Sequence, residues 1–334
     1  MEQMIRMTRA SGLPPEWDSL AGHYFQQREF LQHAEIHNPC RQRYYLLWQE
    51  NSLMAAAVVY SQKIDLLTYP HVLTPLTMQV IGIPCSVSCP GIFGETHAVR
   101  IFKKEIFNQE KGFRLALNLE EPETAGDNAF GHTLPAIILQ QLPGSWTEYR
   151  SSLRSDYRRR LDRLYRSQES YSCRMSDCTL FTQEMYRQYL GVWQRSHARL
   201  EKLTVSFFSE LPPSFSLTTC FSGDITAGWT ISLHHERKHY FFMGGVNRSL
   251  PEAHDIYMYL LAEIVREGIE LGSDEIDLGQ TAEIPKIRMG GVPIPRYMEA
   301  HLSFPPLNRM LKKFSGLLEY RGEFPETRVY KDRK

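Results

Sequence analysis

The sequence predicts an α/β protein of two domains, and three observations lead to this prediction. The chain has 334 residues, which is enough for two domains of about 150 residues each. Each half alternates runs of β-branched and aromatic residues with amphipathic helical segments. The clearest helical pattern stands between the halves. We therefore expect domains at 1–144 and 170–334, connected by a helix at 145–169.

The first half reads as a helix followed by strands. Residues 15–36 predict the helix, with Trp17, Phe25 and Leu31 among its apolar anchors. "RYYLLWQ" (43–49) and "LMAAAVVYS" (53–61) predict two strands around a polar turn. The remaining segments are a β-like stretch (63–81), a loop that leads into a helix (88–102), a strand (113–121), and a short strand with a turn (132–145).

The connecting segment, "SWTEYRSSLRSDYRRRLDRLYRSQE" (145–169), predicts one long helix. Ser145 and Glu148 have the spacing of a capping box. Apolar residues recur at steps of three and four: Trp146, Tyr149, Leu153, Tyr157, Leu161 and Leu164. The other faces carry arginines: Arg150, Arg154, Arg158, Arg159, Arg160, Arg163 and Arg166. Between Arg150 and Arg166, Asp156 and Asp162 alone offset them, so the helix forms a local basic patch.

The second half also alternates predicted helices and strands. A helix is predicted at 182–199, followed by a hairpin of "TAGWTISLHH" (226–235) and "KHYFFMGGV" (238–246). A helix at 252–271 follows, with Gly272 as its C-terminal cap. Residues 274–280 then predict a strand, and "DLGQTAEIPKIRMGG" (277–291) leaves this strand as a polar, glycine-bearing loop.

Composition limits the partners and the location. Lysine plus arginine equals aspartate plus glutamate, so any contact with nucleic acid or a membrane needs a local patch. No stretch reaches the roughly 18 apolar residues of a membrane helix, and the N-terminus has no apolar core of signal-peptide type. We expect a cytoplasmic protein without a membrane span.

Six cysteines include two close pairs, Cys85/Cys89 and Cys173/Cys178. Their spacings are C-x3-C and C-x4-C, whereas common zinc sites use C-x2-C. We expect reduced, buried thiols and no metal.

Four segments in this order resemble GNAT-fold proteins of the FemABX type: residues 144–166, "LEKLTVSFFSEL" (200–211), 240–272, and "DLGQTAEIPKIRMGG". The resemblance covers residues 140–305 well and the first half weakly. It implies two tandem acyltransferase domains with mixed central sheets, and an active cleft in the second domain. It also implies transfer of an aminoacyl or acyl group to an amine, without a separate cofactor.

The catalytic candidates lie at the end of the strand predicted at 274–280 and in the polar segment that follows it, because ligands gather beyond the carboxyl ends of strands in α/β sheets. Lys286 matches the lysine typical of this segment in the family, although the aromatic residue that often precedes it is missing. Lys286 and Arg288 could hold a phosphate, an ester or a developing oxyanion; the alternative is that both are solvated loop charges. Glu283 is a candidate base, and Gln280 could donate to a carbonyl.

Other candidates would bind the substrates. His254 and Asp255 start the 252–271 helix, where an anion could bind, and Asp255 is expected to be a cap. Tyr240 lies on the hairpin as a substrate platform or as a core residue. Arg158, Arg159 and Arg160 would contact donor phosphates, unless they only pair with neighbouring acids.

The identity of the acyl donor determines which kind of transferase we expect. GNAT enzymes that use acetyl-CoA bind pyrophosphate on a glycine-bearing loop before a helix. The equivalent stretch here, "NRSLPEAHD" (247–255), has Arg248 but no glycine, and it carries Glu252. We therefore expect an aminoacyl-tRNA donor, as the resemblance implies, with a cell-wall precursor or small metabolite as the amine acceptor. The alternatives are an acyl-CoA or acyl-carrier N-acyltransferase and a non-catalytic GNAT-like binding protein.

Overall fold

The chain forms two compact units in the computed structural model, which describes residues 2–67, 72–85, 87–122, 127–167, 171–196 and 199–331. Unit 1 contains Met1–Leu134, Ser196–Phe207 and Pro295–Gly322. Unit 2 contains Pro135–Arg195, Phe208–Ile294 and Glu323–Lys334. Each unit is thus assembled from three separate stretches, and the residues of the expected connecting helix lie inside unit 2.

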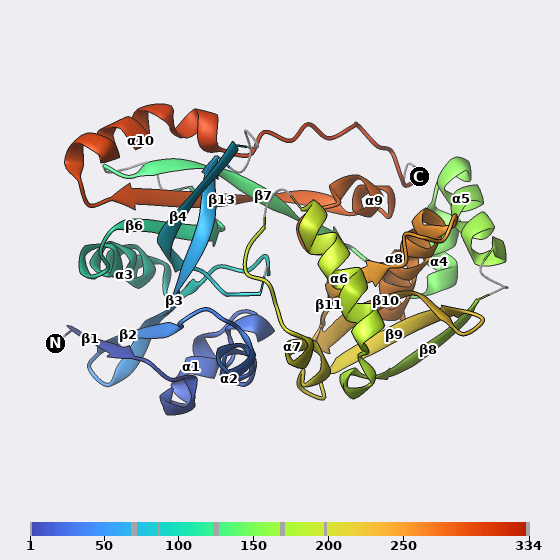
Figure 1. Cartoon of the computed structure of the whole chain (residues 1–334), viewed down its shortest axis with the longest axis horizontal. Coiled ribbons are helices and arrows are strands. Elements are labelled where there is room, and N and C mark those ends of the chain that lie inside the picture. The colour runs from blue at the N-terminus through green and yellow to red at the C-terminus, as the bar shows by residue number, and fades with distance from the viewer. Residues whose placement is uncertain are drawn as a thin grey trace. The chain divides into compact units, whose positions relative to one another are not determined.

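Unit 1 is built on a mixed sheet (Figure 1). Its strands are β1 (Glu2–Met7), β2 (Arg43–Gln49), β3 (Ser52–Leu67), β4 (Val72–Ile81), β5 (Ile92–Gly94), β6 (Phe113–Leu119) and most of β13 (Val292–Leu302). Their order is β1-β2-β3-β4-β6-β13, and β5 pairs with β3. Neighbours are antiparallel except for the parallel pair β4 and β6. The strands predicted from the first half are therefore present, while residues 68–71 of the predicted β-like stretch lie outside the described residues.

Helices cover both faces of this sheet. They are α1 (Glu16–Leu20), α2 (Arg28–His37), α3 (Thr96–Gln109) and α10 (Pro305–Leu318). Successive residues of a strand point to opposite faces. Val59 accordingly belongs to the buried cluster that contains Phe102 of α3, and Tyr60 to the cluster that contains Leu311 of α10. The core of unit 1 therefore has two layers, one under α3 and one under α10.

The single helix predicted over residues 15–36 is wrong. α1 ends at Leu20 and α2 begins at Arg28, because the Gln26 side chain organises a turn between them. Its Oε1 accepts hydrogen bonds from the backbone N–H groups of Gly22 (2.9 Å) and His23 (3.1 Å). The apolar anchors have helical spacing, but they carry no information about this side-chain turn.

Unit 2 repeats the plan of unit 1. Its strands are the later part of β7 (Ala129–Gln140), β8 (Ser172–Asp177), β9 (Phe215–Ser222), β10 (Ile225–His235), β11 (Lys238–Val246) and β12 (Glu275–Asp277). Their order is β7-β12-β11-β10-β9-β8, and only β11 and β12 are parallel. In each unit, counted from β1 and from β8, the first four strands of this path are antiparallel, the fourth pairs in parallel with the fifth, and the sixth pairs antiparallel with the fifth. The predicted hairpin of β10 and β11 is confirmed.

Helices also cover both faces of the second sheet. They are α4 (Trp146–Ser152), α5 (Ser155–Ser167), α6 (Gln183–Arg195), α8 (Ala253–Glu270) and α9 (Glu283–Arg288), while the residues of α7 (Val205–Ser209) are divided between the units. Gly228 of β10 faces α8, since a Cβ there would lie 2.9 Å from Ile256. Trp229 faces the other way, towards Phe208, whose ring lies 4.8 Å from that of Tyr189 on α6. No helix within the described residues is long and apolar enough to cross a membrane.

The long helix predicted over 145–169 is two helices, and residues 168–169 lie outside the described residues. The predicted cap is present: Ser145 Oγ accepts from the Glu148 N–H (3.2 Å), although the Glu148 carboxylate accepts from Gly144 N–H. The helix breaks at Leu153, which is extended. The C-terminal segment pairs with the break, since Arg154 N–H donates to the Val329 carbonyl (3.0 Å). This contact lies far away in sequence, so the helical periodicity could not reveal it.

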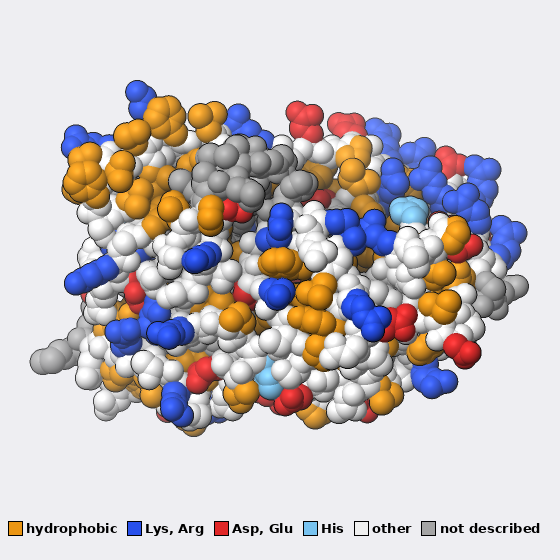
Figure 2. All heavy atoms as spheres, viewed as in Figure 1, with side chains coloured by type: hydrophobic (Ala, Val, Ile, Leu, Met, Phe, Trp, Pro, Cys, Tyr) orange, Lys and Arg blue, Asp and Glu red, His pale blue; other side chains and the backbone are white. Residues whose placement is uncertain are grey.

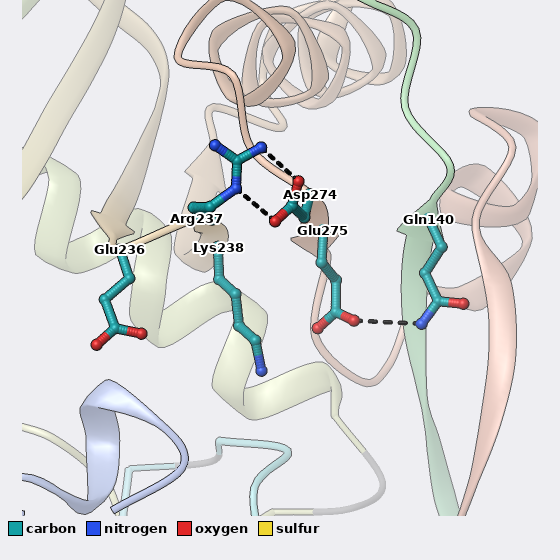
Figure 3. A pocket seen from close by; sticks show the side chains of 6 residues that line it. All are labelled: Gln140, Glu236, Arg237, Lys238, Asp274 and Glu275. Atoms are coloured by element: carbon teal, nitrogen blue, oxygen red, sulfur yellow. Dashed lines mark hydrogen bonds and ion pairs between the residues drawn. The ribbon is translucent and has the colours of Figure 1, made fainter. Parts of the chain in front are cut away.

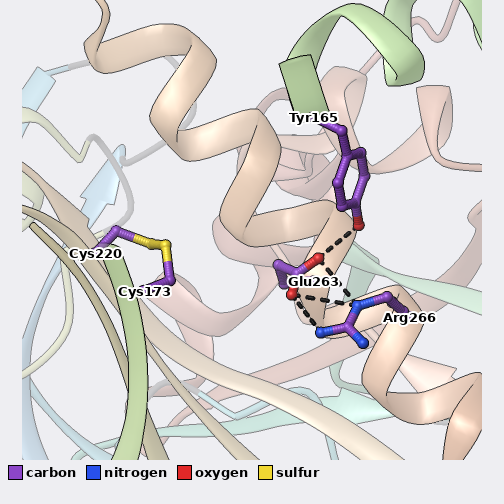
Figure 4. Close-up of a disulfide and its surroundings, with 5 residues drawn as sticks. All are labelled: Tyr165, Cys173, Cys220, Glu263 and Arg266. Atoms are coloured by element: carbon purple, nitrogen blue, oxygen red, sulfur yellow. Dashed lines mark hydrogen bonds and ion pairs between the residues drawn. A yellow bond between two sulfur atoms is a disulfide. The ribbon is translucent and has the colours of Figure 1, made fainter. Parts of the chain in front are cut away.

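The expectation of reduced thiols is wrong for one pair. Cys173 of β8 and Cys220 of β9 occupy directly opposed positions in the sheet and form a disulfide, drawn in Figure 4. The other cysteines, Cys40, Cys85, Cys89 and Cys178, are free and buried. No group of three or more metal-ligating side chains occurs among the residues that were placed.

Candidate functional site

The candidate site lies where β11 and β12 part. The two parallel strands pair only from Lys238 opposite Glu275 to Tyr240 opposite Asp277. β12 then ends, whereas β11 continues to Val246. The carboxyl end of such a pair is the usual ligand position in α/β sheets. The chain from Gln280 onward starts at this position.

A turn with left-handed residues redirects the chain after β12. Asp277 Oδ1 accepts a hydrogen bond from the Gly279 N–H (2.6 Å), as in an Asx turn. Gly279, Thr281 and Ala282 have φ values of 72°, 53° and 49°. A non-glycine residue in this conformation costs about 1–2 kcal/mol, and such strain concentrates at functional sites.

The predicted loop at 280–288 is wrong in part, because residues 283–288 form the helix α9. Lys286 lies on this helix and is 2% exposed, so it is not a solvated loop charge. Its Nζ donates a hydrogen bond to the Gln280 carbonyl oxygen and lies 5.6 Å from the centroid of the Phe241 ring. The strained turn therefore places an ammonium group inside unit 2, next to Gly279 and Gln280.

Burial sets the protonation of Lys286. It lowers the pKa of the ammonium from 10.5 to about 8, while the charges of Asp277 and Glu283 oppose this shift. Lys286 is therefore mainly protonated at neutral pH. An ammonium has three N–H donors, and Gln280 is its one hydrogen-bond acceptor among the described residues. The remaining donors can stabilise negative charge that develops on a bound carbonyl oxygen.

Glu283 and Gln280 share this site with Lys286, but in different ways. Glu283 is half-buried in the first turn of α9, and Gln280 contributes its backbone carbonyl. Sequence reasoning missed Asp277, Phe241 and Tyr257. Burial and then the charge of Glu283 raise the pKa of Tyr257, on α8, to about 12. An acidic residue that closes the last strand was a usable signal for Asp277; nothing local indicated the two aromatic residues.

The other predicted ligands lie elsewhere in unit 2. Arg288 is exposed at the end of α9, and His254 is exposed in the first turn of α8. Tyr240 is only 3% exposed within the sheet, so it is a core residue and offers no platform for a substrate. The structure thus groups Gln280, Glu283 and Lys286. Arg288, His254 and Tyr240 lie outside this group.

The start of α8 does not have the features of a pyrophosphate site. Its N-cap is Glu252 and not Asp255, which lies in the first turn. Glu252 makes no side-chain capping bond, so two carboxylates stand near the positive end of the helix dipole. The preceding loop is closed by Asn247, whose Oδ1 accepts from the Ser249 N–H (3.1 Å). A bound anion would therefore meet these two carboxylates as well as Arg248 of the preceding loop.

The basic patch predicted on 145–169 lies largely on α5, which carries five arginines and two aspartates. Figure 2 shows lysine and arginine side chains gathered over this end of unit 2. Arg159 pairs with Asp156, and the Arg160 guanidinium lies 5.7 Å from the Tyr157 ring centroid. Arg158 forms no ion pair with any described residue. Several arginines of the patch are thus available to an external anion, although the ion-pair alternative holds for Arg159.

α5 is fixed to the helices of the site. Tyr165 Oη donates to Glu263 of α8 (2.5 Å), which also pairs with Arg266, as Figure 4 shows. Leu161 of α5 and Ile287 of α9 belong to one buried cluster. The basic helix and the helix of Lys286 therefore pack on the same core.

A pocket of about 430 Å³ opens at the start of β11 and β12, away from their carboxyl ends. Figure 3 shows its lining side chains: Gln140, Glu236, Arg237, Lys238, Asp274 and Glu275. Arg237 pairs with Asp274, and Gln140 Nε2 donates to Glu275 (3.2 Å). Most of these polar groups therefore satisfy one another, and Lys286 lies outside this pocket.

Comparisons with known proteins agree with this architecture. Residues 151–286 match the family described as Acetyltransferase (GNAT) domain, a span that includes α5 and ends at Lys286. No curated protein matches the sequence. The crystal structure of FemX has 10% identity and a TM-score of 0.51, over 93% of this chain and 100% of that one. The structure of L-PGS from Bacillus licheniformis has 12% identity and a TM-score of 0.50, over 91% and 96% of the two chains.

At these identities the structural likeness establishes the fold and leaves the substrate open. The resemblance to FemABX-type proteins is confirmed at this level, as is the expectation of tandem GNAT-like domains with mixed sheets. Together, the GNAT match and the fold support an acyltransferase.

Proposed function

We propose that the protein transfers an aminoacyl group from aminoacyl-tRNA to an amine, with formation of an amide. The observation that carries this proposal is the buried Lys286 ammonium at the parted ends of β11 and β12, with donors left for a substrate oxygen. A preorganised donor in a buried site stabilises a developing oxyanion more strongly than water does.

The reaction balances with groups at this site. The acceptor nitrogen attacks the ester carbonyl of the donor, so that a C–N bond forms and the C–O bond to the ribose breaks. Lys286 stabilises the oxyanion between these steps. Glu283, half-buried beside it, accepts the proton from the acceptor amine and passes it to the departing ribose oxygen, or that oxygen takes the proton directly as it leaves.

Two observations favour a tRNA donor. Arginines on α5 offer contacts for backbone phosphates, with Arg158 and Arg160 as the first candidates and Arg159 as a third that would have to leave Asp156. The acidic start of α8 opposes a pyrophosphate. The acceptor would be an amine on a cell-wall precursor or a small metabolite.

A second candidate is an N-acyltransferase that uses acyl-CoA or an acyl carrier. The match of residues 151–286 to an acetyltransferase domain favours it. The same lysine would then stabilise the oxyanion formed from a thioester.

Donor binding separates these candidates. The full chain is titrated with charged tRNA, uncharged tRNA, acetyl-CoA and a longer acyl-CoA at two salt concentrations. Preferential binding of charged tRNA, weakened steeply by salt, supports the aminoacyltransferase. Binding of an acyl-CoA alone supports the second candidate. Binding of no donor contradicts both and favours a non-catalytic GNAT-like protein.

The variant Lys286→Met tests the role of the ammonium. It keeps most of the stem volume and removes the charge, so transfer should fall about 10²–10³-fold. Lys238→Met, at the pocket of Figure 3, is the matched control and should retain activity. A Lys286→Met protein with wild-type transfer would refute this role. Because folding buries this charge at a cost, the variant should be at least as stable as the wild type at pH 7.

A further inference from the structure

An exposed apolar stripe runs along α10 in unit 1. Its residues are Leu307, Met310, Phe314 and Leu317, and Phe304 precedes the helix. Steps of three and four residues place the four helical members along one side. All five side chains are 45–64% exposed. We call these five residues the α10 stripe.

The stripe is not the packing face of the helix. Leu311 and Asn308 are 7% and 5% exposed, and they hold α10 on the sheet. Leu311 joins the cluster that contains Tyr60, and Asn308 Oδ1 accepts from the Leu302 N–H (2.9 Å). The contacts of α10 within the unit are therefore made beside the stripe, which stays open.

Large exposed apolar side chains are normal when they stand singly. Within the described residues, most exposed large apolar side chains outside α10 stand singly, such as Ile36 and Ile225. On α10 they are continuous, and Figure 2 shows the resulting apolar patch over this helix. A continuous apolar surface marks an interaction site.

The charges beside the stripe define the partner. Arg309, Lys312 and Lys313 are exposed, and α10 contains no acidic residue. Lys313 Nζ lies 5.9 Å from the centroid of the Phe314 ring, so a cationic group borders the stripe directly. An apolar helix side with basic residues next to it fits the surface of an anionic bilayer, with apolar groups at the acyl boundary and cations at the headgroups.

We propose that α10 docks the protein on anionic lipid surfaces, with the α10 stripe in the headgroup–acyl boundary. A second copy of the chain fits the stripe less well. A two-fold contact between two such helices brings the same basic residues, Arg309, Lys312 and Lys313, together from both sides. Like charges across an interface oppose association.

Vesicle flotation of the full chain tests the proposal. Phosphatidylcholine vesicles are compared with vesicles in which one third of the lipid is phosphatidylglycerol. We expect binding to the anionic vesicles that weakens with salt. Phe314→Ser/Leu317→Ser should lower the partition coefficient at least about ten-fold, because two apolar side chains no longer enter the bilayer. Lys312→Gln/Lys313→Gln should weaken anionic binding by about ten-fold and leave the low affinity for phosphatidylcholine unchanged.

Ile36→Ser is the matched control, because Ile36 is 74% exposed in the same unit but lies on α2. It should bind vesicles like the wild type. All substituted side chains are exposed, so circular dichroism and thermal unfolding should match the wild type. Equal binding by the wild type and Phe314→Ser/Leu317→Ser overturns the proposal. The proposal is also overturned if the wild type binds no vesicles but forms a dimer, and the double variant is a monomer. The stripe would then serve self-association.

Discussion

At the scale of single residues, the protein keeps a charge where burial opposes it. Lys286 has a lowered pKa, and Asp277 and Glu283 recover only part of the solvation that its ammonium loses. For a lysine whose pKa is lowered on folding, stability rises with pH between the folded value and the unfolded value. The cost is therefore full below about pH 8 and disappears as the pH approaches 10.5. A group kept at such a cost is a functional candidate.

Transfer should depend on the protonation of Lys286. If its ammonium stabilises the oxyanion, single-turnover transfer should fall above about pH 8, after correction for spontaneous donor hydrolysis. Lys286→Arg keeps the positive charge, so any activity that it retains should not fall in this range. A wild-type fall that persists unchanged in Lys286→Arg would assign it to another group.

Gly279 controls the space beside this ammonium. Its φ is 72°, and a Cβ there would lie 3.9 Å from Lys286 Nζ without a clash. Gly279→Ala should therefore cost about 1 kcal/mol of unfolding free energy, from the left-handed backbone alone. If the Lys286 ammonium binds the substrate oxygen, the methyl group 3.9 Å from Nζ should also weaken transfer. Gly272→Ala, with φ of 69° and open surroundings, is the matched control and should affect stability only. Equal activity in both variants would contradict this account, and urea unfolding measures the stability of each.

At the scale of elements, two short helices define the site in unit 2. α9 buries Lys286 because a left-handed turn precedes it, and α5 presents arginines because its apolar side packs on the same core as α9. The break between α4 and α5 separates these arginines from the rest of the predicted helix. Its cause is the pairing of the C-terminal segment with Leu153 and its neighbours. The spacing of apolar residues in a helix depends on that helix alone, so it does not indicate pairing with the distant C-terminal segment.

The arginines of α5 should determine the salt dependence of tRNA binding. Arg158 and Arg163 make no ion pair with a described residue, so both can contact phosphates. In Arg158→Gln/Arg163→Gln, the slope of log K against log salt should become shallower by about 1–2, and affinity should fall. Arg237→Gln is the matched control in the same unit, because Arg237 already pairs with Asp274. An unchanged slope in the double variant would remove α5 from the donor site.

At the scale of the whole molecule, two units share one plan without a visible sequence repeat. In each unit the last strand comes from a different stretch of the chain than its neighbour in the sheet. In unit 1 this strand is β13, which pairs with β6, and in unit 2 it is β7, which pairs with β12. Strand order, and not residue identity, is what the units have in common. Unit 2 alone carries the disulfide and the candidate catalytic group.

The disulfide should stabilise unit 2. It closes a loop with a sequence separation of 47, for which chain entropy predicts about 4 kcal/mol. Cys173→Ser/Cys220→Ser should lose this amount in urea unfolding, and donor binding should persist at low denaturant because neither residue belongs to the site. Alkylation in denaturant should label four cysteines before reduction and six afterwards. Six labelled cysteines before reduction would contradict the bond.

The sequence by itself determined the α/β class, most strands of the first half, the β10–β11 hairpin and α8. It also grouped Gln280, Glu283 and Lys286 at the end of a strand. These features follow from local signals, namely side-chain period, turn residues and caps, which act over a few neighbouring positions. The family resemblance added the tandem arrangement, and the fold confirms it.

Only the tertiary structure decided which of these residues are buried and what they contact. It turned the predicted loop at Lys286 into a helix, moved Tyr240 into the core, joined Cys173 to Cys220, and divided the helices at 15–36 and 145–169. It also left the α10 stripe open. Each outcome depends on partners distant in the chain, because burial and pairing are properties of the packed molecule that local periodicity does not encode.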